Sequence, residues 1–435
     1  MNKIIKQIWN QRRMNAWIFI EIIIAGFFLW TVIDPMYVLM VNHLEDKGYE
    51  EEGRYVLNLG AFGSSHGKRD TTITNDMRKE AFYRFVQLIQ EQPEVESAYV
   101  SMHSSMPNSL SWSGGQFYPD TLAIKDKKHT HAQRYSILSV KGCDIFRTLG
   151  MKDARTGKEL TMPEDADNFC YVSELFAQKM FGSTEVIGKE VYDGTINIGK
   201  IGAVFQNVKT RDYNASYPLV IAFDKDFSMH DWVHKNNYIV FRLKEGVDFE
   251  KFNERFTKEV APHMNQGNFY FDCFKPFDET RRELGTRMGV YNKLRLKGSL
   301  TAFTLLCIFL GMVGTFWIRC NARRQEIGLM RSMGATEGRV KNQFLTEAGL
   351  LVSGAFVLSL VLVVNFVVIT DGMAQPSFSG DINSVLISEW LSPSVQFTMV
   401  SLITYLALLV IALVGTLIPV RRAVKVLPAD ALRDE

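Results

Sequence analysis

The stretch RCNARRQEIGLMRSMGATEGRVKNQFLTE, residues 319–347, decides the fold of this 435-residue chain. It carries Arg and Lys at six positions and lies between two runs without any charge, 299–318 and 348–370. Each run is long enough to cross a hydrocarbon core of about 30 Å as a helix. Loops rich in Lys and Arg stay on the cytoplasmic side of a membrane. The stretch is therefore expected to be a cytoplasmic connection between two membrane helices.

The residues inside this connection predict its local structure. Ile327, Met330 and Met333 recur about one helical turn apart, which indicates a short amphipathic helix. Gly334 stands where a helix can end in a left-handed residue, and Thr336 can cap the helix that follows. The pattern predicts a short helix, a turn and a second helix that returns to the membrane.

Two motifs carry a resemblance to a known family. RRQEIGLMRSMGAT, residues 323–336, and LIPVRRAVKVLPADALRDE, residues 417–435, each adjoin a long apolar run. They resemble motifs of the MacB/FtsX-like permeases, membrane subunits of ABC systems that include the lipoprotein-releasing permeases. The second motif departs from the family at Val420, where Ala is usual. A basic loop that merely follows the positive-inside rule is the alternative, and the pair of motifs beside apolar runs disfavours it.

The resemblance implies a coupling site for a separate ATPase subunit. The residues that it assigns to this site are Glu326, Ile327, Met330, Arg331, Met333 and Gly334. The chain has no Gly-x-x-x-x-Gly-Lys-Ser/Thr pattern with which to bind a nucleotide. We therefore expect no catalytic residues, no cofactor and no metal in this chain, which is not an enzyme by itself, and we expect ATP hydrolysis in a partner.

The expected fold class is a membrane protein with four transmembrane α-helices and a large α+β extracytoplasmic domain between the first and second spans. The last outer loop has no Lys or Arg, whereas the tail after the fourth span has four, so both termini are expected in the cytoplasm. The predicted segments are a cytoplasmic N-terminus (1–13), a first span with the start of a stalk (14–42), a periplasmic core domain (43–279), a stalk helix (280–298), a second span (299–318), the coupling region (319–347), a third span (348–370), an outer loop (371–394), a fourth span (395–420) and a cytoplasmic tail (421–435).

Several polar and small residues stand out in the spans. Glu21 lies in the middle of the first span, and an ionisable group inside a membrane suggests a function, with pairing at a helix interface as the alternative. Trp17, Trp30, Trp317 and Trp390 lie near predicted span ends, where such rings commonly settle. Small residues that allow close helix packing are Gly311, Gly314, Ser353, Gly354, Ser359 and Gly415.

The long polar segment between the first two spans is predicted to contain both strands and helices. Strands are predicted at 54–59, 98–102, 133–140, 200–205, 217–223 and 238–243, and helices at 75–91, 174–181 and 248–263. The order FRTLG (146–150), VSELFAQKMFG (172–182), VIGKEV (186–191) and IGAVFQNV (201–208) resembles the periplasmic core domain of MacB-like permeases. This mixture favours an α+β domain.

Cysteines, histidines and a basic cluster leave alternatives open. Cys143, Cys170 and Cys273 lie in the polar segment and permit at most one disulfide there, with buried free thiols favoured. The pairs His129/His131 and His230/His234 lack a third metal ligand, so a metal site is disfavoured. The cations at 281, 282, 287, 293, 295 and 297 indicate a solvated stalk, with contacts to anionic lipid headgroups as the alternative.

Three functions fit the family resemblance. The first is export of a peptide or drug-like substrate, with a second permease, identical or related, a periplasmic adaptor and an outer-membrane channel as partners. The second is lipoprotein release, and the third is signal transmission to a cell-wall hydrolase. All three place the chain in the inner membrane, in contact with lipid. Nucleic acid is not a favoured partner, because the net charge is only +2 and the cations gather at span edges.

Overall fold

The computed structural model describes residues 12–63, 66–102, 105–109, 113–224, 237–370, 372–375 and 388–424. The chain divides into two compact units. One is an α/β domain, residues 42–290, and the other is a helical unit built from the described residues before 42, from 291 to 375 and after 387. The tail from residue 425 on, and with it the end of the second family motif, lies outside the described residues.

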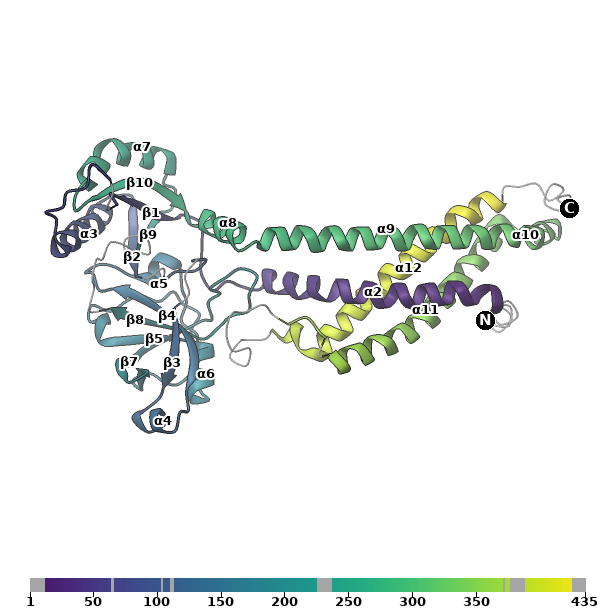
Figure 1. Ribbon diagram of the computed structural model, residues 1–435, viewed down its shortest axis with the longest axis horizontal. Helices are drawn as coiled ribbons and strands as arrows, with labels where there is room; N and C mark the ends of the chain where they lie inside the picture. Colours follow the sequence, from purple (N-terminus) through teal and green to yellow (C-terminus); the bar gives the residue numbers. More distant parts are fainter. Residues whose placement is uncertain are drawn as a thin grey trace. The chain divides into compact units, whose positions relative to one another are not determined.

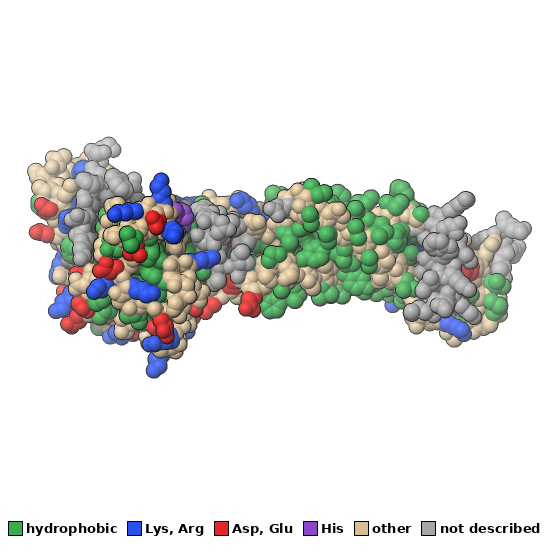
Figure 2. All heavy atoms as spheres, turned by 90° about the horizontal axis from the view of Figure 1, so that it is seen from below, with side chains coloured by type: hydrophobic (Ala, Val, Ile, Leu, Met, Phe, Trp, Pro, Cys, Tyr) green, Lys and Arg blue, Asp and Glu red, His purple; other side chains and the backbone are tan. Residues whose placement is uncertain are grey.

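Four long helices make up most of the helical unit. They are α2 (Arg12–Leu44), α9 (Val290–Ala322), α11 (Glu337–Thr370) and α12 (Pro393–Val424). By length and composition each can cross a membrane, which confirms the four expected spans. Many Leu, Ile, Val and Phe side chains of these helices are exposed, and Figure 2 shows them as a continuous apolar surface. Such a surface is suited to lipid rather than to water.

The helices pack through one buried face of α2. Ile18, Ile22, Ala25 and Leu29 recur three or four positions apart and lie in a shared core with side chains of α9, α11 and α12. Gly26 allows a close approach, since a Cβ there would lie 2.6 Å from the Ser359 hydroxyl.

The small residues expected at helix contacts behave differently from one another. A Cβ on Gly415 would meet Val313 at 3.3 Å, and the Ser353 hydroxyl lies 2.9 Å from that of Tyr405. Gly314, by contrast, faces open space. Within one chain, Gly314 therefore makes no close helix contact.

The helix α2 is longer than its apolar run. It continues through Pro35 to Leu44, in agreement with the expected start of a stalk after the first span. Trp30 lies within this long helix. Its ring is fully buried, and its Nε1 donates a hydrogen bond to Ser401 Oγ at 3.1 Å. The ring is thus held between helices, and its place near a span end stays a prediction. Asp34 is also buried, and it accepts hydrogen bonds from Gln396 Nε2 and from the Ala374 amide.

The α/β domain is built on one ten-stranded mixed sheet (Figure 1), whose strand order is β10-β1-β9-β2-β4-β3-β6-β7-β5-β8. Most neighbours are antiparallel, while β4–β8 and β5–β7 are parallel. The strands are β1 (Arg54–Ala61), β2 (Val95–Met102), β3 (Gly114–Tyr118), β4 (Thr130–Leu138), β5 (Phe169–Ser173), β6 (Glu190–Asp193), β7 (Ile196–Phe205), β8 (Leu219–Asp224), β9 (Tyr238–Leu243) and β10 (Phe269–Pro276). This architecture confirms the expected α+β class.

Helices cover the sheet and close separate cores. They are α3 (Asn75–Gln90), α4 (Thr121–Lys125), α5 (Ile145–Leu149), α6 (Glu174–Phe181), α7 (Phe249–Glu259) and α8 (Phe277–Arg287), with short 3-10 turns at Ala166–Asn168 and Ala261–Met264. Helices α3 and α7 pack on β1, β2, β9 and β10, whereas α6 packs on the part of the sheet that contains β5, β7 and β8.

Two predicted helices are interrupted. The helix expected at 248–263 ends at Glu259 and gives way to a 3-10 turn that contains Pro262, because proline cannot supply the amide hydrogen that an α-helix needs. The single stalk helix expected at 280–298 is two helices. Helix α8 ends at Arg287, Gly289 has a φ of +66°, and α9 begins at Val290. A left-handed glycine is a common helix terminator.

Candidate functional site

The connection between α9 and α11 contains a buried cluster of opposite charges. Arg319, at the end of α9, and Arg323, just after it, both bind the carboxylate of Glu347 on α11, at 2.5 and 2.7 Å. Arg323 also forms a two-pronged contact with Glu326 at 2.7 and 2.9 Å. We call these four residues the Arg–Glu cluster. It joins three consecutive helices by charge-assisted hydrogen bonds.

The Arg–Glu cluster contributes to stability mainly because three of its four side chains are buried. Arg319, Arg323 and Glu347 are 3%, 4% and 1% exposed, and the Arg323 guanidinium also lies 4.6 Å from the centre of the Phe344 ring. Buried charges require partners, and removal of one partner is strongly destabilising. Arg319 and Arg323, which the sequence predicts in a cytoplasmic connection, are thus neutralised by carboxylates inside the protein.

Helix α10 (Arg324–Ser332) follows the cluster and ends in the predicted turn. Gly334 has a φ of +89°, and the amide of Ala335 donates to the carbonyl of Met330 at 3.0 Å. Thr336 Oγ1 accepts from the Arg339 amide at 3.3 Å, in the first turn of α11. The left-handed glycine and the threonine cap are both confirmed.

The face of α10 that was expected to act as a unit is divided between two environments. Ile327 is 2% exposed and packs with Val340, Phe344 and Val420, so it holds α10 against α11 and α12. Met330 packs at the edge of the same cluster.

The opposite face of α10 is open. Met333 is 72% exposed and Leu329 is 52% exposed. Arg331 lies 3.8 Å from the carboxylate of Glu337, across the turn. The helix therefore has one anchored face and one apolar exposed face, and Leu329 and Met333 form what we call the exposed edge.

Comparison with known proteins agrees with this geometry. Residues 298–428 match the family described as FtsX-like permease C-terminal. This part of the chain is similar to that family, and we call it the FtsX-like domain. The domain includes α10, α11, α12 and the whole Arg–Glu cluster.

Relatives of the chain extend beyond this domain. Over 320 residues it is 26% identical to the macrolide export ATP-binding/permease protein MacB of Chromobacterium violaceum, a match that covers 69% of this chain and 43% of that protein. The chain thus spans less than half the length of that relative. It is 20% identical to an uncharacterized ABC transporter permease of Methanocaldococcus jannaschii, with 69% of this chain and 70% of that protein covered. The periplasmic region of MacB from Actinobacillus actinomycetemcomitans matches 56% of this chain and 97% of its own length at 13% identity, with a TM-score of 0.33.

Glu21 lies at the contact of α2 with the FtsX-like domain. Its carboxylate accepts a hydrogen bond from Thr315 Oγ1, on α9, at 2.9 Å. A Cβ on Gly311 would lie 2.6 Å from Glu21 Oε1, so the missing side chain leaves the space that the carboxylate occupies. The structure thus brings Glu21 to a helix interface, with a hydroxyl as its partner.

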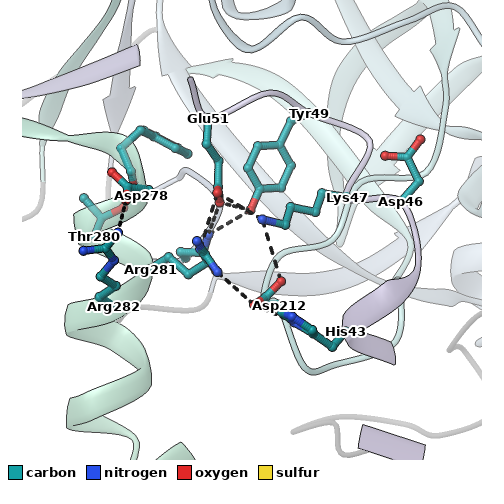
Figure 3. A network of polar contacts seen from close by, with 12 residues as sticks. His43, Asp46, Lys47, Tyr49, Glu51, Asp212, Asp278, Thr280, Arg281 and Arg282 are labelled. Atoms are coloured by element: carbon teal, nitrogen blue, oxygen red, sulfur yellow. Dashed lines mark hydrogen bonds and ion pairs between the residues drawn. The ribbon is translucent and has the colours of Figure 1, made fainter. Parts of the chain in front are cut away.

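A second polar network lies inside the α/β domain, where the chain enters it after α2 and leaves it through α8 (Figure 3). Asp212 lies 3.2 Å from His43 Nδ1 and 3.3 Å from Arg281 Nη1. Glu51 binds Lys47 at 3.0 Å and Arg281 Nε at 3.3 Å. These five residues, the root network, link the entry segment to α8.

The sequence analysis missed both polar networks. Glu347 and Asp212 are 24 and 69 residues from the arginines Arg323 and Arg281 that bind them. No local spacing rule identifies such pairs. The one signal in the sequence is the carboxylate of Glu347, which directly precedes an uncharged membrane span and therefore calls for a partner.

The cysteines and histidines of the α/β domain form neither disulfides nor a metal cluster among the described residues. All five cysteines are free, and burial raises the pKa of Cys143 and of Cys170 to about 12. His129 and His131 face each other with their Nε2 atoms 3.0 Å apart. In the described ranges no three potential ligands gather at one point. His230 and His234 lie outside those ranges.

Proposed function

We propose that this chain is the permease subunit of an ABC-type export system, in which a separate ATPase subunit drives movement of the α/β domain. The observation that carries the proposal is the construction of α10. One face is fixed to the membrane helices by Ile327 and the Arg–Glu cluster, and the other presents Leu329 and Met333. An exposed apolar edge on a rigidly held helix is suited to docking of another protein.

The Arg–Glu cluster connects α10 to α9 and α11, so a movement of α10 can be transmitted to both membrane helices. A displacement of α10 acts on Arg323 and Glu326, and through Glu347 it reaches both α11 and α9. Helix α9 follows α8 across the break at Gly289, and α8 carries Arg281 of the root network. Coupling requires two arrangements with different affinities for the partner's nucleotide states. Closure of the ATPase pair would favour one of them.

The proposed setting is the inner membrane, with α10 in the cytoplasm and the α/β domain in the periplasm. The assembly contains two permeases, identical or related, and two ATPase subunits. A periplasmic adaptor and an outer-membrane channel complete the path of a peptide or drug-like substrate. Support for export comes from the names of two relatives, the macrolide export protein MacB and a pyoverdine export protein of Pseudomonas aeruginosa.

Lipoprotein release is the second candidate. The observation that favours it is a groove between α2 and α9 that is lined by apolar side chains and contains the Glu21 carboxylate. A lipid-accessible groove is what an extractor of acylated proteins requires. Photocrosslinking of an acylated protein to residues beside Glu21 would favour release over export.

The exposed edge provides the test of the proposed function. The full chain is purified from its own membranes with the ATPase that accompanies it, as wild type and as the variants Leu329→Asp and Met333→Asp. We expect each variant to lower ATPase recovery and substrate-stimulated hydrolysis at least tenfold, because a carboxylate cannot be buried at an apolar contact without a partner. The control is Met77→Asp, a substitution at a 49% exposed methionine of the α/β domain.

Two results would overturn the proposal. One is an ATPase that remains bound and fully stimulated in both variants. The other is labelling of an Arg331→Cys variant by an impermeant thiol reagent added to the outside of intact cells, because this would place α10 on the wrong side of the membrane.

A further inference from the structure

Two histidines face each other just after α4, the helix at the lower end of the α/β domain in Figure 1. The Nε2 atoms of His129 and His131 are 3.0 Å apart, and the two rings are nearly perpendicular, at 89°. Two ligand atoms with bonds of about 2.0–2.1 Å to one metal ion lie about 2.9 Å apart at right angles and about 3.3–3.4 Å apart in a tetrahedron. The observed separation lies between these values, so it fits two ring nitrogens on one ion.

The turn after α4 fixes the first of the two rings. Lys127 has a left-handed φ of +56° where the helix ends, and the Lys128 amide donates to the Ala123 carbonyl at 3.0 Å. The Lys127 carbonyl then lies 3.0 Å from His129 Nδ1. A carbonyl can only accept, so in the neutral ring Nδ1 carries the proton and Nε2 presents a lone pair. A carbonyl on the other ring nitrogen is the common support of a metal-binding histidine.

The sheet fixes the second ring. His131 lies in β4 directly opposite Gln116 of β3, and side chains opposite each other in antiparallel strands share one face. Tyr118, two residues further along β3, lies on that face as well. Its ring centre is 5.8 Å from that of His129, and its hydroxyl donates to Gln116 Oε1 at 3.2 Å. The strand thus positions His131, and Tyr118 supports His129 from the side of β3.

Open space beside the pair leaves room for the other ligands of an ion. His129 is exposed, His131 is half-buried, and a hollow of about 570 Å³ adjoins His129. The hollow is lined by carboxylates and ammonium groups of Asp120, Asp126, Lys127, Lys128 and Lys179. Because these charges are mixed, an ion would depend on the ring nitrogens rather than on an acidic surface. Imidazole suits the later first-row metals, and among the divalent ones Cu²⁺ binds most tightly to such ligands.

We propose that His129 and His131 form an open binding site for one transition-metal ion, tightest for Cu²⁺, with water in the remaining positions. The hard cations Ca²⁺ and Mg²⁺ prefer oxygen ligands and are not expected to compete. The sequence disfavours a metal here because no third ligand accompanies the pair, whereas the facing ring nitrogens, which only the structure shows, favour a site with two protein ligands. This inference goes beyond the proposed function, since binding requires neither an ATPase nor transport.

The test uses the full chain in detergent micelles, purified without a polyhistidine tag. The other histidine pair of the sequence, His230 and His234, is replaced by glutamine in every sample so that it cannot compete. One equivalent of Cu²⁺ is added, and pulsed electron paramagnetic resonance counts the imidazoles bound to it. We expect two. His129→Gln and His131→Gln should each leave at most one and weaken binding at least tenfold, because the chelate is lost. The control His263→Gln, at an exposed histidine after α7, should change neither result.

A measurement on the wild-type chain separates binding from loss of structure in the variants. Diethyl pyrocarbonate modifies accessible histidines, and mass spectrometry follows each one. We expect Cu²⁺ to slow modification of His129 and His131 at least tenfold relative to His263, and the same concentration of Ca²⁺ to have no effect. Equal modification with and without Cu²⁺, or fewer than two imidazoles on the ion, would overturn the proposal and leave a hydrogen bond between the two rings. Two imidazoles retained in either glutamine variant would also overturn it, because the ion would then lie elsewhere.

Discussion

Glu347 and Arg323 are joined at 2.7 Å although 24 residues separate them, and both side chains are almost completely buried. The same carboxylate holds Arg319 with its other oxygen. One residue of α11 therefore neutralises two cations from the end of α9 and the segment after it. This arrangement ties the end of α9, the segment after it and α11 to one carboxylate, and such a link is what the connection needs if force on it is to reach the membrane helices.

The first prediction concerns the charge of Glu347. Glu347→Gln leaves Arg319 and Arg323 buried beside a neutral amide, and we expect the free energy of unfolding of the helical unit to fall by about 3–5 kcal/mol. The measurement is unfolding of the full chain in mixed micelles, followed by circular dichroism. Glu337→Gln is the matched control, because that carboxylate is 45% exposed, binds Lys341 one turn away and lies 3.8 Å from Arg331. Such a pair contributes about 0.5 kcal/mol or less. Equal effects of the two substitutions would show that the cluster is not energetically distinct.

The turn after α10 gives the second prediction. Gly334 has open space around it, so the cost of a larger residue comes from its φ of +89° alone. Left-handed geometry costs a residue with a side chain about 1–2 kcal/mol, and more for a β-branched one. We therefore expect Gly334→Val to destabilise the turn and to reduce substrate-stimulated ATPase activity, and Gly334→Asn to do so less. The control is Gly338→Ala in the first turn of α11, where nothing lies within 4 Å and φ is helical. Full stimulation with valine at position 334 would exclude the turn from coupling.

The root network gives the third prediction. Asp212→Asn removes the buried charge that pairs with His43 and Arg281, whose side chains are 39% and 23% exposed, and we expect a cost of about 1 kcal/mol. The consequence is looser attachment of α8, which hydrogen exchange would register as at least tenfold faster exchange within Phe277–Arg287. Asp278→Asn serves as the control, because Asp278 binds Arg282 on the surface of the same helix. If both variants exchange alike, the root network does not hold α8.

Local signals account for the parts of the fold that could be predicted. Helix α6 begins and ends where the sequence indicated, because Ser173 caps its start and the left-handed Gly182 ends it. The end of α10 at Gly334 follows the same rule. The expected single stalk helix is interrupted at Gly289, which is another left-handed glycine. A glycine at this position is a helix-ending signal of the same kind, and the prediction of one helix overlooked it.

Long-range relationships account for the parts that could not be predicted. The strand β3 begins with two glycines and gives no strand signal, and its neighbours β4 and β6 determine it. The partners of Glu347 and Asp212 are set by helix and loop packing rather than by spacing. Glu21 was recognised as unusual from sequence, whereas its donor Thr315 and the groove around both required the structure.

The fourth prediction uses the buried thiol of Cys170, on β5. Burial raises its pKa in the folded protein to about 12, above its ordinary value of 9.0. Unfolded chains therefore lose this proton first as the pH rises, so the stability that the neutral thiol contributes is complete below pH 9 and is lost between pH 9 and about 12. Between pH 9 and 10 the slope approaches about 1.4 kcal/mol per pH unit for each such thiol. Pulse proteolysis in urea measures it in the α/β domain of the full chain. Cys170→Ala should remove the contribution of this thiol and leave that of Cys143, whose pKa is raised in the same direction. An unchanged slope in the alanine variant would mean that Cys170 is accessible to water in the folded domain.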